Sequence, residues 1–264
     1  MKTISMKSNF KFLAIATFLG LFLQSCSSDD DNGAALNAPV ISNFEYGEGS
    51  SHSTDQVAYK GSDIHLGAKI NAEATVSSIT LSIHAHGLTP ANDEVDWDFE
   101  KVYTDSKYLA INPTFHEHID VPANIPAGEY HIELTVTDKL GNSTEVEGHI
   151  LILDLITLSD ISIDATVARG DDFHAEFMIN AVNGIHNITV DIHAHGIEPG
   201  EGEIEWHYKE IFSEGYHDQT TAEFHKHIDV PATAPAGEYH VLFTVEDEDG
   251  NTKTYETHIE VTME

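Results

Sequence analysis

Apolar and polar residues alternate along much of the chain, which is the pattern of β-strands with one buried face. Every second residue is apolar in DIHLGAKINA (residues 63–72), SITLSIHA (78–85) and EYHIELTVTD (129–138). Turn sequences such as PAG and LGN separate these segments, and beyond the N-terminal region no stretch has the period of a helix. The pattern therefore predicts an all-β fold.

The sequence contains one unit twice. HAHG at residues 84–87 recurs at 193–196, and FHEHIDVP at 115–122 recurs as FHKHIDVP at 224–231, each 109 positions later. Since the same offset holds from Asp63 to Ile150 without a gap, the repeat spans a whole domain rather than a short motif.

The segment VPANIPAGEYHIELTVTDKLGN (residues 121–142) resembles the penultimate strand and final hairpin of immunoglobulin-like domains on bacterial surfaces, and residues 230–251 repeat it. The resemblance implies an immunoglobulin-like β-sandwich. Together with the repeat, it predicts two tandem sandwiches, at residues 38–153 and 154–264.

The first 25 residues are predicted to be a lipoprotein signal peptide. Three lysines precede the apolar run FLAIATFLGLFL, and LQSC (residues 23–26) resembles a lipobox, which implies lipidation of Cys26. The SSDDDN that follows resembles the surface-export signal of Bacteroidota lipoproteins. We therefore expect residues 26–37 to be an acidic linker that tethers the domains to the outer membrane, exposed at the cell surface.

Charge narrows the range of partners. The chain has 12 Lys and Arg against 45 Asp and Glu, a formal charge of −33. Such a field repels phosphate backbones, which excludes nucleic acid as a partner, and it attracts cations. Cys26 is the single cysteine, so the chain offers no intramolecular disulfide and no thiolate cluster for a metal.

Histidines are the candidate ligands, and there are 18 of them. Alternation turns the histidines of the repeated motifs away from the core, and we expect the five of each copy to converge at one end of the sandwich. Imidazole nitrogens bind zinc at about 2.0–2.1 Å, and three or four suffice. The predicted ligands are His84, His86, His116, His118 and His131 in the first copy and His193, His195, His225, His227 and His240 in the second.

Comparison of the two copies strengthens this prediction. They agree at 14 of 17 positions from Phe115 to His131 but at only 3 of 23 from Pro90 to Asn112, and all five histidines are kept. We expect one ion per repeat, zinc first and copper(II) second, with Asp120 and Asp229 orienting the imidazoles. The remaining histidines are interpreted as surface residues: His52, His65, His149, His174, His186, His207, His217 and His258.

The motifs HxHG, HxHIDVP and GEYH together resemble an uncharacterised family of Bacteroidota surface lipoproteins with tandem immunoglobulin-like domains. The resemblance implies the fold and the location but no activity. The function that we infer from the residues is capture or buffering of metal ions at the cell envelope, with an outer-membrane transporter as a candidate partner.

Other function classes remain open. HxH on a β-sandwich resembles copper–zinc superoxide dismutases in that motif alone, and a hydrolytic zinc would need a general base. Glu117 is the nearest candidate, but Lys226 replaces it in the second copy, so we expect no enzyme. A surface module that binds glycan or protein is the main alternative, because Trp97 and Trp206 recur within a divergent stretch. A pH-sensing role for the histidines is a further one.

Overall fold

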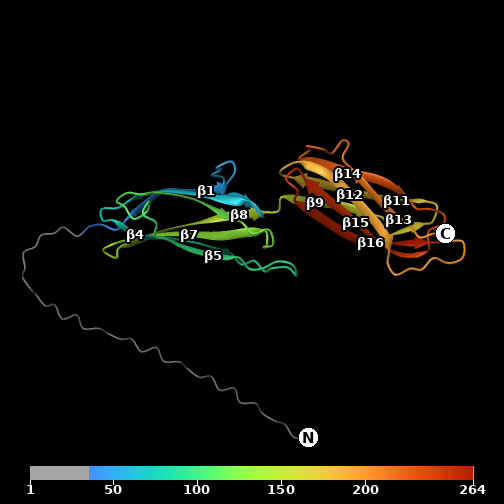
Figure 1. Ribbon diagram of the computed structural model, residues 1–264, viewed down its shortest axis with the longest axis horizontal. Helices are drawn as coiled ribbons and strands as arrows, with labels where there is room; N and C mark the ends of the chain where they lie inside the picture. Colours follow the sequence, from blue (N-terminus) through green and yellow to red (C-terminus); the bar gives the residue numbers. More distant parts are fainter. Residues whose placement is uncertain (1–35, 264) are drawn as a thin grey trace, which may run out of the picture. The chain divides into compact units, whose positions relative to one another are not determined.

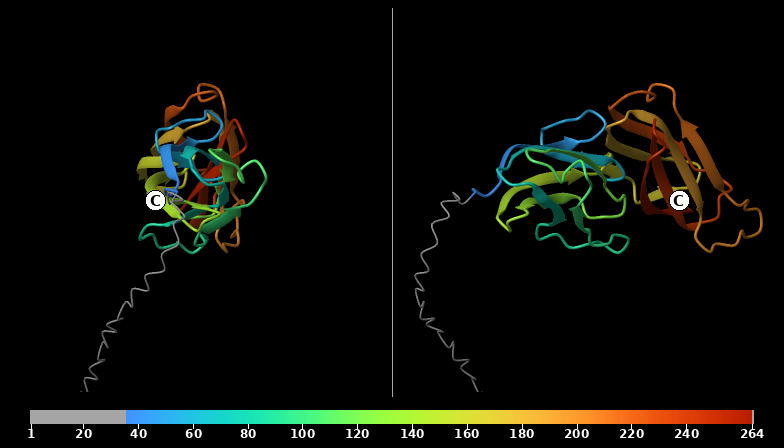
Figure 2. Two further views of the ribbon diagram at one scale, coloured as in Figure 1. Left: turned by 90° about the vertical axis from the view of Figure 1, so that its left-hand side faces the viewer. Right: turned by 60° about the vertical axis from the view of Figure 1, so that its left-hand side comes forward.

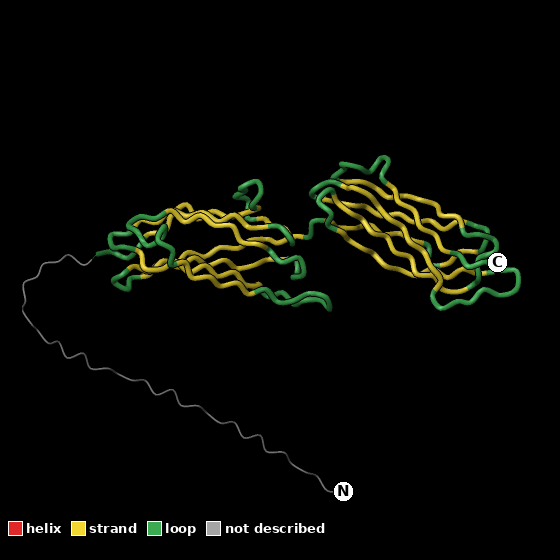
Figure 3. The backbone as a smooth tube through the Cα atoms, in the orientation of Figure 1, coloured by secondary structure: helices red, strands yellow, loops and turns green. Residues whose placement is uncertain are grey.

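The computed structural model describes residues 36–263, and the signal peptide and Cys26 lie outside this part of the chain. The regular elements of the described residues are β-strands joined by loops and turns (Figure 3). Within residues 36–263, no helix has the length and hydropathy that spanning a membrane requires. The all-β prediction is confirmed.

The first domain contains eight strands (Figure 1). They are β1 (Val40–Glu48), β2 (Val57–Tyr59), β3 (Asp63–Asn71), β4 (Val76–Ala85), β5 (Asp98–Tyr103), β6 (Thr114–Asp120), β7 (Gly128–Asp138) and β8 (Ser143–Leu153). The three-stranded sheet has the order β1-β3-β6, and the five-stranded sheet has the order β2-β8-β7-β4-β5.

The second domain repeats this arrangement. Its strands are β9 (Ile156–Ile163), β10 (Thr166–Ala168), β11 (Asp172–Ala181), β12 (Ile185–Ala194), β13 (His207–Phe212), β14 (Thr221–Asp229), β15 (Gly237–Asp247) and β16 (Thr252–Thr262). The orders are β9-β11-β14 and β10-β16-β15-β12-β13. The prediction of two tandem β-sandwiches is therefore confirmed, and Figure 2 shows the layered strands in two further views.

Each sandwich buries the apolar residues that alternation identified. Ile64 and Leu66 of β3 and Ile83 of β4 are fully buried, and so are Ile132 and Leu134 of β7. Their side chains fill the space between the two sheets, whose mean separation in such folds is about 10 Å. The opposite faces of the strands carry the polar residues, and the histidines of the motifs lie there.

A tyrosine at the start of the penultimate strand fixes the corner that precedes it. The Tyr130 hydroxyl donates a hydrogen bond of 2.9 Å to the carbonyl of Pro126, and Tyr239 donates an equivalent bond of 2.9 Å to Pro235. This is the tyrosine corner of immunoglobulin-like sandwiches. It holds the GEYH segment, with its histidine, at the same place in both domains.

The two domains differ most between their first two strands. Residues 49–56 form a loop between β1 and β2, whereas only residues 164 and 165 separate β9 from β10. The loop follows Glu48, whose carbonyl accepts a hydrogen bond of 2.9 Å from the backbone N–H of Ser53. The first domain therefore has a loop between its two sheets, which carries His52, where the second has a tight connection.

Candidate metal centres

A row of histidines crosses the five-stranded sheet of the first domain. His84 of β4 faces His131 of β7, which in turn faces His149 of β8 in the strand register. The ring centroid of His131 lies 5.0 Å from that of His84 and 5.1 Å from that of His149. His86 stacks on His149 at 5.3 Å. We call His84, His86, His131 and His149 the five-strand cluster.

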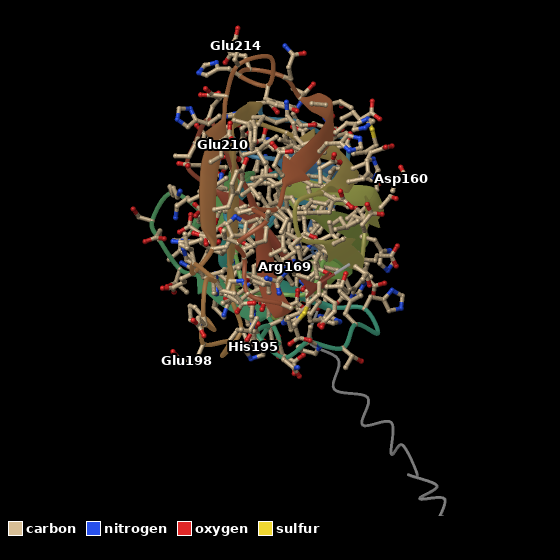
Figure 4. The ribbon with its side chains drawn as sticks, turned by 90° about the vertical axis from the view of Figure 1, so that its right-hand side faces the viewer. Asp160, Arg169, His195, Glu198, Glu210 and Glu214 are labelled. Atoms are coloured by element: carbon tan, nitrogen blue, oxygen red, sulfur yellow. The ribbon has the colours of Figure 1, made fainter. Side chains whose placement is uncertain are left out.

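The second domain contains the matching cluster at the equivalent strand positions. His240 of β15 faces His193 of β12 and His258 of β16. The ring centroid of His240 lies 4.2 Å from that of His195 and 4.3 Å from that of His258. One nitrogen from each of His195, His240 and His258 lies within 4.8 Å of the others. Figure 4 shows His195 at the margin of the domain, beside the loop that carries Glu198.

Carboxylates hold equivalent rings of these clusters in both domains. Nδ1 of His86 lies 2.8 Å from the Glu129 carboxylate, and Nδ1 of His195 lies 2.7 Å from that of Glu238. A carboxylate at Nδ1 favours the proton there and leaves Nε2 as the free electron pair, which is the usual arrangement behind a metal-bound histidine.

A second cluster lies on the outer face of the three-stranded sheet. His118 of β6 faces His65 of β3, and His116, two residues before His118, lies on the same side of β6. The loop residue His52 stacks on His65 with 4.6 Å between ring centroids. One nitrogen from each of the four lies within 4.8 Å of the others. We call His52, His65, His116 and His118 the four-histidine cluster.

His65 is the buried member of this cluster. Its relative exposure is 5%, and its Nδ1 has no hydrogen-bond partner among residues 36–263. Burial lowers the pKa of His65 because it disfavours the imidazolium form, and the nearby His116, His52 and His118 lower it further. The neutral ring that results is the form that binds metal ions.

The second domain has a smaller counterpart on β11 and β14. His174 faces His227 across the strands, and Glu176 faces His225. Glu176, which stands where the first domain has Gly67, has a carboxylate oxygen 3.2 Å from Nε2 of His174 and 3.7 Å from Nδ1 of His225. This group therefore combines imidazoles with a carboxylate.

The predicted convergence of five histidines in each domain is wrong. In the first domain His84, His86 and His131 lie on the five-stranded sheet, whereas His116 and His118 lie on the three-stranded sheet. Strand alternation correctly predicted that the side chains of all five face away from the core. Because β6 pairs with β3 rather than with a strand of the other sheet, the apolar core separates the two groups.

The same separation holds in the second domain. His193 lies on β12, His195 in the turn after β12 and His240 on β15. His225 and His227 lie on β14 of the other sheet. Each domain therefore offers two histidine clusters on opposite outer faces instead of the single one that we expected.

The predicted orienting carboxylates are also replaced by their neighbours. Nδ1 of His118 lies 2.5 Å from Asp63, and Nδ1 of His227 lies 2.5 Å from Asp172. Asp63 faces Asp120 directly across β3 and β6, and Asp172 faces Asp229 in the same way. The contacts to the imidazoles thus come from the residue opposite the predicted one.

Sequence reasoning missed several members of the clusters. His65 and His149 recur as His174 and His258, so the recurrence that singled out the other histidines also marks these. His52 has no counterpart, and only the conformation of its loop brings it to the cluster. In the second domain His186 and His217 form a further group with Glu248, whose oxygens lie 3.2 and 3.6 Å from their ring nitrogens.

Both tryptophans are packing residues. Trp97 and Trp206 are 9% and 6% exposed. Their rings lie 5.5 Å from Tyr130 and 5.1 Å from Tyr239, between centroids. Neither indole presents a free face for stacking on a sugar, which removes the feature that favoured a glycan-binding role.

Glu117 is held by neighbouring groups. Its carboxylate accepts hydrogen bonds from Lys107 at 2.6 Å and from the Tyr108 hydroxyl at 2.5 Å. Burial alone would raise the pKa of Glu117, but these hydrogen bonds outweigh burial and lower it. A carboxylate with a lowered pKa is a poor general base at neutral pH.

A family model matches both repeats, at residues 24–153 and 154–262, and its description is "Domain of unknown function (DUF4625)". The chain belongs to this family. The match to each repeat separately agrees with the two β-sandwiches of the structure. No curated protein matches the sequence.

Several solved structures match the chain at low sequence identity. A tetra-tandem repeat from the extending region of a large adhesion protein is 11% identical, with a TM-score of 0.32, 86% of this chain and 51% of that one covered. A 1.5-MDa bacterial ice-binding adhesin is 13% identical, with a TM-score of 0.32, and the match covers 85% of this chain and 65% of that one. The Bacteroides ovatus SGBP-B, in complex with a mixed-linkage heptasaccharide, is 14% identical, with a TM-score of 0.26, and the match covers 86% of this chain and 48% of that one. The chain thus spans about half to two thirds of these structures.

Proposed function

We propose that this protein is a lipid-anchored protein of the cell envelope that binds first-row transition-metal ions, zinc first and copper(II) second, for capture or buffering. The observation that carries the proposal is the five-strand cluster, which occurs in both domains at equivalent positions. His86, His131 and His149 match His195, His240 and His258, and a glutamate holds Nδ1 of the first ring in each trio.

The ligand chemistry favours zinc and copper(II). Imidazole nitrogen is a borderline ligand that suits both ions, whereas calcium and magnesium prefer oxygen. A tetrahedral ion with bonds of 2.0–2.1 Å requires its nitrogens to lie about 3.4 Å apart. One nitrogen from each of His195, His240 and His258 lies within 4.8 Å of the others. Side-chain rotations that move each nitrogen by about an ångström therefore bring them onto one ion.

Exposure of the cluster suits exchange of the ion with solution. The side chains of His195 and His240 are 54% and 23% exposed, so an ion bound there keeps a face open to solvent. The acidic exterior of the chain raises the local concentration of cations. Capture or buffering requires this accessibility, whereas a purely structural ion would be enclosed.

The anchor and the location belong to the same proposal. Lipidation of Cys26 would place both domains outside the membrane, on an acidic linker, where they meet metal ions before a transporter does. The prediction rests on the sequence of residues 1–37, and mass spectrometry of the protein isolated from membranes tests it through the mass of the lipidated N-terminus.

Zinc titration with native mass spectrometry tests the binding function. The protein from residue 27 onward is compared with a variant in which His86, His149, His195 and His258 are replaced by alanine. We expect the parent to bind two ions more than the variant, one for the open cluster of each domain. The matched control replaces His207, an exposed histidine outside the trio, and should retain both ions. Equal ion counts for parent and quadruple variant would contradict the proposal.

A further inference from the structure

The four-histidine cluster of the first domain contains a ligand that the second domain lacks. His52 lies in the loop of residues 49–56, which is absent between β9 and β10. Its ring contacts all three other rings, with centroids 4.6 Å from His65, 5.0 Å from His118 and 5.7 Å from His116. The loop therefore closes over a group that is already assembled on β3 and β6.

The loop is held in this conformation by Glu48. Its carboxylate accepts hydrogen bonds of 2.8 Å from the backbone N–H groups of Ser50 and Ser51, and the hydroxyls of both serines donate to it as well. The backbone N–H of Gly49 bonds to the carbonyl of Asp63 at 3.0 Å. These contacts tie the loop to the start of β3, only two residues before His65.

His65 supplies the sign that this group has a ligand. The ring is 5% exposed, yet within the part of the chain that the structure describes its Nδ1 atom has no hydrogen-bond partner. A buried polar atom without a partner costs about 1–3 kcal/mol, and most such atoms in folded proteins are satisfied. Three more imidazoles surround this ring, and an ion among them would use its free nitrogen.

The orientation of His118 agrees with this interpretation. Asp63 lies 2.5 Å from its Nδ1, which leaves Nε2 for an ion. One nitrogen from each of the four residues lies within 4.8 Å of the others, against about 3.4 Å in a tetrahedral zinc site. His52 is exposed and sits on a loop, so it is the ligand that moves to close the difference.

We propose that His52, His65, His116 and His118 form a second, distinct zinc site, closed by the loop of residues 49–56 and present in the first domain alone. The inference deepens the proposed function, because it assigns a tighter four-nitrogen site to one domain in addition to the open cluster in each. A closed set of four protein ligands is typical of tightly held zinc, whereas an open position is typical of exchangeable or catalytic zinc.

The second domain provides the internal comparison. Its group on β11 and β14 has His174, His225 and His227 with Glu176, and none of the described residues takes the place of His52. The side chains of His225 and His227 are 51% and 59% exposed, whereas that of His118 is 36% exposed. Zinc at this group would be held more weakly, since it lacks the covering loop.

The test removes the open clusters first. In a background with His86, His149, His195 and His258 replaced by alanine, the protein from residue 27 onward is titrated with zinc against a chromogenic chelator. We expect one tightly bound ion to remain. Replacement of His52 by alanine should weaken this ion by more than about 100-fold, which exceeds the usual effect of removing a residue that only orients a ligand. Thr54→Ala, in the same loop, is the matched control and should leave the affinity unchanged.

Hydrogen exchange supplies a second measurement that does not depend on affinity. Zinc should slow exchange of the backbone amides of residues 50–56, and His52→Ala should abolish this protection. An unchanged zinc affinity in His52→Ala, or no protection of the loop by zinc, would overturn the inference. If this site binds zinc but the parent protein binds no ion at the open clusters, only the proposed function is contradicted, because the two groups lie on opposite sheets.

Discussion

The hydroxyl of Tyr46 lies 2.0 Å from the position that a Cβ atom on Gly148 would occupy. Tyr46 extends from β1 over β8, where its hydroxyl oxygen accepts a hydrogen bond of 3.1 Å from the backbone N–H of His149. The glycine thus admits the tyrosine ring, and the tyrosine positions the backbone that carries one histidine of the five-strand cluster. The second domain has Ile163 in the place of Tyr46 and Thr257 in the place of Gly148, so two residues of intermediate size stand there instead of a large one and a glycine.

Replacement of Gly148 by alanine should destabilise the first domain by about 1–3 kcal/mol, because the added methyl group overlaps the Tyr46 ring. Urea unfolding followed by Trp97 fluorescence, in a Trp206→Phe background, measures this change. The pair from the second domain, Tyr46→Ile with Gly148→Thr, should recover most of the stability that Gly148→Thr alone loses. Additive effects of the two single changes would show that the residues do not interact.

Trp97 should behave as a core residue. Trp97→Ala is expected to lower the free energy of unfolding of the first domain by about 3–5 kcal/mol, and Trp97→Phe by less, because its ring retains part of the packing on Tyr130. Calorimetry resolves the effect as a shift of one domain transition, while the fluorescence of Trp206 reports an unchanged second domain. Wild-type stability in Trp97→Ala would contradict the packing role and revive a surface role for the indole.

Glu48 should make the stability of the first domain depend on pH. Burial alone would raise the pKa of Glu48, but the hydrogen bonds from Ser50 and Ser51 outweigh it and lower the pKa from 4.5 to about 2. A lowered pKa in the folded state stabilises the protein fully above the ordinary value, and this stabilisation is lost as the pH falls from 4.5 toward 2.

Glu48→Gln tests that dependence. We expect a loss of about 1–2 kcal/mol at neutral pH, of the order of hydrogen bonds to a charged group, and a smaller difference from wild type at pH 3. Denaturant unfolding at several pH values measures both. A difference that stays constant from pH 7 to pH 3 would exclude the carboxylate as its source.

Asp63 should affect zinc affinity through His118. Asp63→Asn retains the shape of the side chain but removes the charge that favours a proton on Nδ1 of the ring. Loss of such an orienting carboxylate typically costs 10–100-fold in affinity, and chelator competition in the background without the open clusters measures it. Asp120→Asn, on the facing strand, is the matched control and should have a smaller effect. Equal losses in the two variants would indicate a general effect of charge instead of a specific contact.

The sequence predicts the outward direction of the histidines but not their partners. Direction follows from alternation within one strand: Ile83 is buried, so His84 is exposed. Partners follow from strand order, which long-range pairing decides, and nothing local in FHEHIDVP indicates that β6 pairs with β3. Recurrence of His65 and His149 in the second repeat was a usable sign of their role, whereas His52 reaches its cluster only through the path of an irregular loop.

The loop of residues 49–56 lies outside both sheets and leaves the core untouched. An insertion of this kind leaves the strand order and the apolar core unchanged, so it costs the fold little. One repeat can therefore carry the additional histidine, His52, while the other has the tight connection at residues 164 and 165. If His52 closes a zinc site as we propose, a difference in one loop is sufficient to give two domains of one repeat different affinities for the same ion.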